Sequence, residues 1–447
     1  MAQKTNTTQL TTSLEHYFFT EDSIKVSFLY LIALALMIFG LFIDPLEDVY
    51  SGFIKILQSP SNLITDYFEV GGIGATFFNA GLLMLINSWA VGRLVTKMTG
   101  PILAAMLTVT GFAFFGKNLY NSIPITLGTL LYSQYRNLPI ANFVLTSLFA
   151  TTLAPVVSII TFGQGLPYYM SIPLGVGVGI LIGFTIHPMG SSFLRFHQGY
   201  NLYNMGFTAG VLGMLIAGLM RAFDLTTTYE PEINPFSIVE VEYFFYGFSL
   251  FLLVSGFILN NKSFKGYGQF RRDSGRLISD FMTDYGVGLS LMNMGILGLA
   301  ALTYVRLLDG VLEGAVIGGV LTVIGFGAFG KHIFNATPVV IGIFLMQVGM
   351  AIDEPSSTTS LLSVLFGTTL APIAGHYGWM AGIVVGLLHA ALVPNTGITH
   401  AGLNLYNNGF AGGFVAATIV PVLDGIRERN ELRERISQNK NDHERNA

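Results

Sequence analysis

Two lysines with matching surroundings are the residues in this sequence best placed to do chemistry. Lys117 lies in the segment FGKNLYNSIP and Lys331 in the segment FGKHIFNATP. The stretches around both segments are apolar, so a cationic side chain there could attract an anion or orient a polar solute inside a membrane. The ordinary alternative is that each lysine extends its amine to the membrane surface and anchors a helix end.

The residues beside each lysine are suited to breaking a helix. A proline removes one N–H from the helical ladder, and an asparagine amide can bond to the backbone groups that this frees. We expect 119–133 and 333–350 to be half-helices or re-entrant segments, each with exposed N–H groups and positive partial charge at its start. The candidate pathway residues here are Lys117, Asn121, Pro124, Lys331, Asn335 and Pro338.

A second motif, in which an asparagine follows one glycine by five residues and precedes another by two, occurs four times. A buried amide needs hydrogen-bond partners, and the ordinary interpretation is that it caps a helix entering the membrane. The functional alternative is a ring of amides from both halves of the chain that binds a polar solute. The asparagines are Asn79, Asn204, Asn293 and Asn407, and Asn201 and Asn404 precede two of them.

Two TTLAP segments, at 151–155 and 368–372, place threonine hydroxyls just before a proline. Such hydroxyls bond back to the preceding turn and bend helices in membranes, which we favour over pore lining. The eight histidines show no metal-ligand spacing, and the chain has no cysteine. We therefore expect no metal site and no cofactor.

Composition indicates where these motifs lie. The 447 residues are 52% apolar and 11% charged, with a mean hydropathy of +0.60. Soluble domains contain about 25% charged residues, so most of this chain is expected to lie in a lipid bilayer. A soluble enzyme and a disordered chain are excluded. The net charge of −4 provides no basic surface for nucleic acid.

An internal repeat divides the apolar part of the chain into two copies. Residues 71–132 align without a gap onto 285–346, and 21 of the 62 positions are identical. Further along, GYNLYNMGFTAG at 199–210 recurs as GLNLYNNGFAGG at 402–413. Several collinear matches of this kind indicate a duplicated unit.

The distribution of basic residues indicates that the copies are inverted. The loop 261–283 contains five Lys or Arg residues, whereas the matching loop 44–70 contains one. The linker 222–240 contains none, and the tail 426–447 contains six. Because cytoplasmic loops are enriched in Lys and Arg, both termini are predicted to be cytoplasmic and the linker external.

The sequence therefore predicts an all-α, polytopic transmembrane bundle of two inverted-topology repeats with re-entrant or broken helices. We expect it in the cell (plasma) membrane. The predicted parts are a cytoplasmic N-terminal segment (1–22), the first repeat (23–222), an external linker (223–240), the second repeat (241–425) and a charged cytoplasmic tail (426–447).

The repeated GFxxFGK and GxNLYNxGF blocks resemble those of an uncharacterised bacterial family of polytopic membrane proteins, known as a domain of unknown function. More distantly, each half is similar to urea transporters, in which a glycine-rich segment precedes a helix and a later half-helix begins near a proline. Here GGIGATFFNAG and NSIP, and then YGVGLSLMNMG and NATP, follow that order. This resemblance implies inverted halves, a central pathway that includes Thr337, and a homo-oligomer such as a trimer.

Inverted repeats with matched helix breaks are typical of transporters and channels, whose solute sites lie where the halves meet. We expect a channel or facilitative transporter for a small polar or anionic solute, with the bilayer and that solute as its partners. An ion- or proton-coupled secondary transporter is the alternative. An integral-membrane enzyme is less favoured, because no nucleophile, metal cluster or carboxylate pair stands out.

Overall fold

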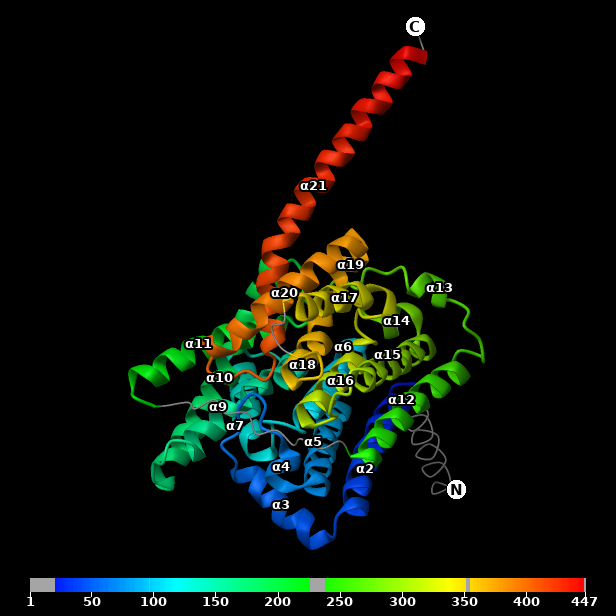
Figure 1. The fold of residues 1–447 in the computed structure, drawn as a ribbon. Coiled ribbons are helices and arrows are strands. Elements are labelled where there is room, and N and C mark those ends of the chain that lie inside the picture. The colour runs from blue at the N-terminus through cyan, green and yellow to red at the C-terminus, as the bar shows by residue number, and fades with distance from the viewer. Residues whose placement is uncertain (1–20, 96, 226–237, 351–353, 446–447) are drawn as a thin grey trace, which may run out of the picture.

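The computed structural model describes residues 21–95, 97–225, 238–350 and 354–445. This part of the chain is helical and contains no β-strand, only one isolated bridge (Figure 1). Within the described ranges, eleven helices are long and apolar enough to cross a membrane, and two further apolar helices, α6 and α16, have only 13 residues each. The predicted all-α, multi-pass bundle is confirmed.

The first copy contains twelve helical elements in the described residues. They are α2 (Glu21–Ile43), α3 (Leu46–Gln58), α4 (Tyr67–Gly71), α5 (Ile73–Leu94), α6 (Gly100–Phe112), α7 (Leu119–Tyr135), η1 (Ile140–Phe143), α8 (Val144–Ala150), η2 (Thr151–Leu153), α9 (Ala154–Phe162), α10 (Tyr168–Phe196) and α11 (Asn204–Ala222).

The second copy repeats this order with small changes. Its elements are α12 (Val239–Leu259), α13 (Tyr267–Phe270), α14 (Phe281–Tyr285), α15 (Val287–Leu307), α16 (Gly314–Phe326), α17 (Ile333–Met350), α18 (Thr358–Gly367), η3 (Thr368–Leu370), α19 (Ala371–Tyr377), α20 (Trp379–Thr399) and α21 (Asn407–Arg445). Parts of three predicted segments lie outside the described residues: 1–20 of the N-terminal segment, 226–237 of the linker and 446–447 of the tail.

Equivalent helices of the two copies run antiparallel, which makes the copies inverted relative to each other. In α6 and α16, a Cβ on Gly111 would lie 2.9 Å from Cα of Gly318, and a Cβ on Gly325 would lie 3.1 Å from Cα of Ala104. These contacts are the same contact made twice, because Gly111 matches Gly325 and Ala104 matches Gly318 in the repeat. The early part of each helix therefore meets the late part of the other, as a two-fold axis between them requires.

The outer helices α2 and α12 follow the same rule. The rings of Phe28 and Phe251 have centroids 5.9 Å apart, and those of Phe39 and Phe244 are 4.6 Å apart. The start of α2 thus packs near the middle of α12, and the end of α2 packs near its start. Because both helices are candidate spans, they cross the membrane in opposite directions.

Each copy also caps the central half-helix of the other. Oδ1 of Asp280, in the second copy, accepts a hydrogen bond from the backbone N–H of Gly100, the first residue of α6, at 2.9 Å. Oδ1 of Asp66, in the first copy, accepts one from the N–H of Gly314, the first residue of α16, at 3.3 Å. A carboxylate there satisfies a free N–H group and complements the positive end of the helix dipole.

The short helices are not the ones that the sequence predicted. The half-helices are α6 and α16, which precede the Gly-Lys pairs, whereas α7 and α17 after them have 17 and 18 residues. The glycine before each lysine has a positive φ, +73° at Gly116 and +101° at Gly330. This conformation ends the preceding helix, so the break lies at the Gly-Lys pair, and α7 and α17 start at the predicted residues, 119 and 333.

The predicted bends at the TTLAP segments are confirmed. The 3₁₀ turns η2 and η3 separate α8 from α9 and α18 from α19. The hydroxyls of Thr151 and Thr368 donate to the carbonyls of Leu148 and Leu365, each at 2.6 Å. These bonds to the preceding turn divide one membrane crossing of each copy into two short helices.

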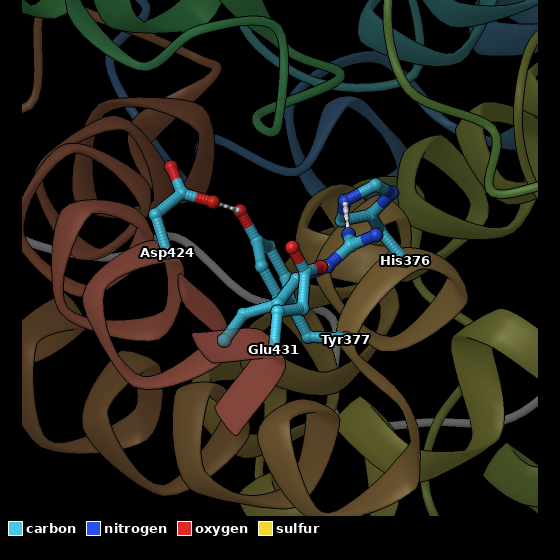
Figure 2. Close-up of polar contacts among 5 residues, drawn as sticks. His376, Tyr377, Asp424 and Glu431 are labelled. Atoms are coloured by element: carbon cyan, nitrogen blue, oxygen red, sulfur yellow. Dashed lines mark hydrogen bonds and ion pairs between the residues drawn. The ribbon is translucent and has the colours of Figure 1, made fainter. Parts of the chain in front are cut away.

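The last helix, α21, continues well beyond the bundle (Figure 1). Figure 2 shows how its middle is tied to the end of α19. The hydroxyl of Tyr377 donates to Oδ1 of Asp424 at 2.6 Å, and Nη1 of Arg427 lies 2.9 Å from Nε2 of His376. Most of the predicted charged tail is therefore a helical extension of the last span.

Candidate functional site

Both lysines lie at the C-terminal end of a central half-helix. The backbone N–H of Lys117 donates to the carbonyl of Phe112 at 3.2 Å, and that of Lys331 donates to Phe326 at 2.9 Å. These bonds follow a glycine in the left-handed conformation and cap the C-terminal ends of α6 and α16. The negative end of a helix dipole favours a cation in this position.

Asn79 and Asn293 hold these turns in place. Nδ2 of Asn79 donates to the carbonyls of Ala113 (2.8 Å) and Lys117 (3.0 Å). Nδ2 of Asn293 donates to the matching carbonyls of Gly327 and Lys331, both at 2.7 Å. Both asparagines lie inside α5 and α15 rather than at a helix start, so the capping interpretation is wrong for this pair. They instead satisfy carbonyls that the break in the chain frees.

Asn121 closes a reciprocal cap at the start of α7. Its backbone N–H donates to Oδ1 of Asn118 at 3.0 Å, and its own Oδ1 accepts from the N–H of Asn118 at 2.9 Å. In α17 the Oδ1 of Asn335 accepts from the N–H of His332 at 2.9 Å. The predicted helix starts at 119 and 333 are confirmed. The expectation that their N–H groups are exposed is wrong for these four residues, because side chains already accept from them.

The prolines of the two segments, Pro124 and Pro338, lie in the early part of α7 and α17, as predicted. The hydroxyl of Thr337 donates to the carbonyl of Ile333 at 2.6 Å, one turn earlier in α17. These three residues shape their helices.

Asn201 and Asn404 join the two copies. Nδ2 of Asn201 donates to the carbonyl of Gly409 at 2.9 Å, and its Oδ1 accepts from the hydroxyl of Thr369 at 2.5 Å. Asn404 makes the mirror-image bonds, to the carbonyl of Gly206 at 3.1 Å and from the hydroxyl of Thr152 at 3.1 Å. All four side chains are buried, so these bonds fix the crossing of α11 and α21.

Asn204 and Asn407 are the first residues of α11 and α21. Oδ1 of Asn204 lies 3.0 Å from Nε2 of His197, and Oδ1 of Asn407 lies 2.9 Å from Nε2 of His400. They also line cavities at the boundary between the copies.

A cluster of six aromatic rings lies on the two-fold axis between the copies. At its centre the rings of Tyr203 and Tyr406, equivalent residues in the repeat, are stacked with centroids 4.3 Å apart. Phe112 packs on Tyr406 at 5.2 Å, and its counterpart Phe326 packs on Tyr203 at 4.7 Å. We call this the aromatic cluster: Phe112, Phe149, Tyr203, Phe326, Phe366 and Tyr406.

Two related cavities flank the aromatic cluster. The first interface cavity, of about 240 Å³, is lined by residues that include Thr146, Phe149, Leu202, Asn204 and Leu277. The second interface cavity, of about 310 Å³, is lined by their counterparts in the repeat, Ser363, Phe366, Leu405, Asn407 and Leu63. Each cavity contains residues of both copies, so the boundary between the copies is hollow on both sides of the rings.

The two lysines differ in what their amines contact. Lys331 is fully buried, its Nζ donates to the hydroxyl of Tyr203, and it lies 4.4 Å from the centre of that ring. Lys117 is 2% exposed and lines a separate cavity inside the first copy. Among the described residues its amine has no hydrogen-bond or ion-pair partner. The structure thus brings Lys331, but not Lys117, into the aromatic cluster.

Sequence reasoning missed both the aromatic cluster and the two capping aspartates. Asp66 and Asp280 are separated by the same offset of 214 residues as the two lysines, and extending the repeat alignment five residues upstream would have paired them. The rings of the aromatic cluster also match in pairs in the repeat, but they come from three separate segments in each copy, so the sequence did not show that they meet. Among the described residues, no three His, Asp or Glu side chains gather in a way that could hold a metal ion.

Comparison with known proteins identifies the family. Residues 46–222 and 259–425 each match the family described as "Protein of unknown function (DUF1576)". The matches cover most of the chain, which therefore belongs to this uncharacterised family, with the family unit present twice. No curated protein and no solved structure matches the chain significantly, so the similarity to urea transporters stays a prediction.

Proposed function

We propose that this membrane protein is a channel or facilitative transporter for a small polar or anionic solute, and that the solute passes between the two inverted copies. The observation that carries this proposal is the pair of two-fold-related interface cavities on either side of the aromatic cluster. Solute sites of inverted-repeat transporters lie where the halves meet near the middle of the membrane.

The size and lining of the cavities support a small solute. Ligand pockets for drug-sized molecules span about 300–1,000 Å³, and the two interface cavities have volumes of about 240 and 310 Å³. Both are mainly apolar with a few polar groups, among them Thr146 and Asn204 in one and Gln347, Ser363 and Asn407 in the other.

The aromatic cluster acts as the gate in this proposal. Rings packed 4–6 Å apart leave no water-filled connection between the cavities, and a dry apolar constriction blocks polar solutes and ions. Passage therefore requires the stacked rings of Tyr203 and Tyr406 to separate. Lys331 supplies a formal positive charge at this gate, which favours an anion or a solute with a carbonyl oxygen.

Flux through reconstituted vesicles tests the proposal. We would measure uptake of urea, acetamide, acetate and chloride by wild-type protein, and then by Lys331→Ala. The expected result is uptake of at least one of these solutes above empty vesicles, and a reduction of at least tenfold in the variant. Lys117→Ala is the matched control, because it removes the same residue from the equivalent turn outside the aromatic cluster.

The hydroxyl groups of the central tyrosines provide a second matched pair. Tyr203→Phe removes the partner of Lys331, whereas the buried hydroxyl of Tyr406 has no hydrogen-bond partner in the part of the chain that the structure describes. Flux should change in the first variant and be unaltered in Tyr406→Phe. Equal flux in wild type, Lys331→Ala and Tyr203→Phe, all folded, would remove the aromatic cluster from the pathway.

One observation favours a second candidate, an ion- or proton-coupled transporter. Glu313 is 1% exposed, and neither of its carboxyl oxygens has a hydrogen-bond partner among the described residues. It directly precedes Gly314, whose N–H is already bonded to Asp66. A buried carboxyl without a partner is a typical proton or cation site in transporters.

An imposed gradient distinguishes the two candidates. If Glu313 couples transport, a proton or sodium gradient will drive accumulation of the solute, and Glu313→Gln will abolish accumulation while downhill flux persists. Accumulation in wild type would rule out a simple channel. Equilibration without accumulation under both gradients would support the facilitative mechanism.

We also propose, from the resemblance to urea transporters, that the protein forms a homo-oligomer in the cell membrane and has no enzymatic activity. The trimer is the form to look for. Mass measurement of the purified protein in detergent micelles tests it, and a strictly monomeric particle would contradict it.

A further inference from the structure

The first copy contains a cavity that the proposed pathway does not use. It has a volume of about 290 Å³ and lies between α5, α7 and the η1–α8 segment. Lys117 lines it, with its side chain 2% exposed and its amine without a partner among the described residues. We call it the Lys117 cavity.

The second copy has lost the features that form this cavity. At the equivalent positions, Ala90 is replaced by Tyr304 and Asn87 by Ala301, while Ser122 and Thr126 become Ala336 and Val340. The hydroxyl of Tyr304 is buried and has no hydrogen-bond partner among the residues that the structure describes, and the ring packs against both large apolar clusters. Since the repeat fold is the same in both copies, architecture alone does not require the open, more polar version.

The Lys117 cavity lacks a counter-charge. A buried ammonium group without a partner is costly in a low-dielectric interior, and the lining residues include no Asp or Glu. The side chains of Asn87 and Ser147, which also line the cavity, make no hydrogen bond within the described part of the chain. An anionic group beside Lys117 would supply the missing charge, and the amide and hydroxyl can donate to it.

Apart from the hydroxyls of Ser122, Thr126 and Thr151, the remaining lining is aliphatic. Leu127 and Leu130, on α7, are about 40% exposed, so this side of the cavity faces the surroundings of the helix bundle. A fully hydrated inorganic ion would gain little from such walls, whereas an alkyl chain would be buried favourably. The other apolar lining residues are Leu83, Val91, Leu94, Ile140, Val144 and Leu148.

We propose that the Lys117 cavity binds an alkyl carboxylate, with the carboxylate on the amine of Lys117 and the aliphatic chain along the leucines. This site does not depend on the pathway between the copies. The ligand can come from water as a short-chain acid or from the bilayer as a fatty acid, since both carry the same head and differ in chain length.

Calorimetric titration of the full-length protein in detergent micelles tests the site, with butyrate and octanoate as probes and octanamide as the uncharged control. We expect a carboxylate to bind and octanamide to bind at least tenfold more weakly. Comparable affinity of butyrate and octanoate indicates a ligand taken from water, and binding of octanoate alone indicates one taken from the bilayer. Absence of binding by both acids, or equal binding of octanoate and octanamide, would overturn the proposal.

Two variants place the ligand in the cavity. Ala90→Tyr introduces the residue that the second copy carries, and Lys117→Met removes the charge at similar length; both should weaken octanoate binding at least tenfold. Lys117→Arg keeps the charge and should retain it. Unchanged binding in a folded Ala90→Tyr protein would refute the site even if Lys117→Met does not fold. The solute flux that depends on Lys331 is measured in a separate experiment. The proposed pathway between the copies and the proposed carboxylate site can therefore fail independently.

Discussion

The reciprocal caps on the half-helices make a quantitative prediction for Asp280→Ala. The carboxylate accepts hydrogen bonds from the N–H of Gly100 at 2.9 Å, and from the N–H and hydroxyl of Thr283 at 3.2 and 2.7 Å. Loss of the cap on α14 costs about 1 kcal/mol. The N–H of Gly100, a buried residue, is left without a partner, which costs about 1–3 kcal/mol more.

The free energy of unfolding should therefore fall by roughly 2–4 kcal/mol. Denaturant titration in mixed micelles, followed by circular dichroism, measures it. Asp280→Asn retains an acceptor oxygen and should lose less. Asp284→Ala is the matched control, because Asp284 is exposed and its one hydrogen bond is 3.4 Å long. Equal losses in Asp280→Ala and Asp284→Ala would refute the capping of one copy by the other.

Three further predictions concern the junction, the packing and the orientation of the copies. Thr369→Val removes the hydrogen bond that the hydroxyl donates to Asn201 and the one that it accepts from the N–H of Tyr203. The free energy of unfolding should fall by about 1–3 kcal/mol in the same titration. An unchanged value would contradict the role of these bonds in joining the two copies. Gly183→Ala should lower the free energy of unfolding by about 1–3 kcal/mol, because the added Cβ would lie 1.9 Å from a carbonyl oxygen of α7. Gly177→Ala is the control and should be neutral, because its Cβ would meet nothing within 4 Å. Equal effects of the two substitutions would refute the close packing. In this cysteine-free chain, a single cysteine at Glu230 should react with an impermeant reagent only from outside, and reaction from the cytoplasm would reverse the predicted orientation.

The duplication could be predicted because identities at a fixed offset are a property of the sequence itself. Its inversion could be predicted because basic residues are distributed oppositely over matching loops. The starts of α7 and α17, at 119 and 333, could also be predicted, because each segment follows a Gly-Lys pair. The sequence did not show that α6 and α16 are the shorter helices, because the apolar residues continue toward the lysines after each helix has ended.

The environments of the two lysines could not be predicted for a different reason. Their local sequences are nearly identical, but Lys331 meets the hydroxyl of Tyr203 while Lys117 points into the space left by Ala90. That difference depends on residues in other helices, whose contacts exist only in the folded bundle. The chosen asparagines are buried except for Asn204, which is partly exposed, yet most of their amides bind backbone groups rather than a free cavity.

Thr146 and Ser363 allow the most direct test of a pathway between inverted copies. They occupy equivalent positions in the repeat and line the first and second interface cavities. Either can be replaced by a single cysteine with little change in size. We predict that an impermeant thiol reagent modifies Thr146→Cys from one side of the membrane only and Ser363→Cys from the opposite side only, and that each modification blocks solute flux. Modification of both from the same side, or unimpaired flux after modification, would contradict the account.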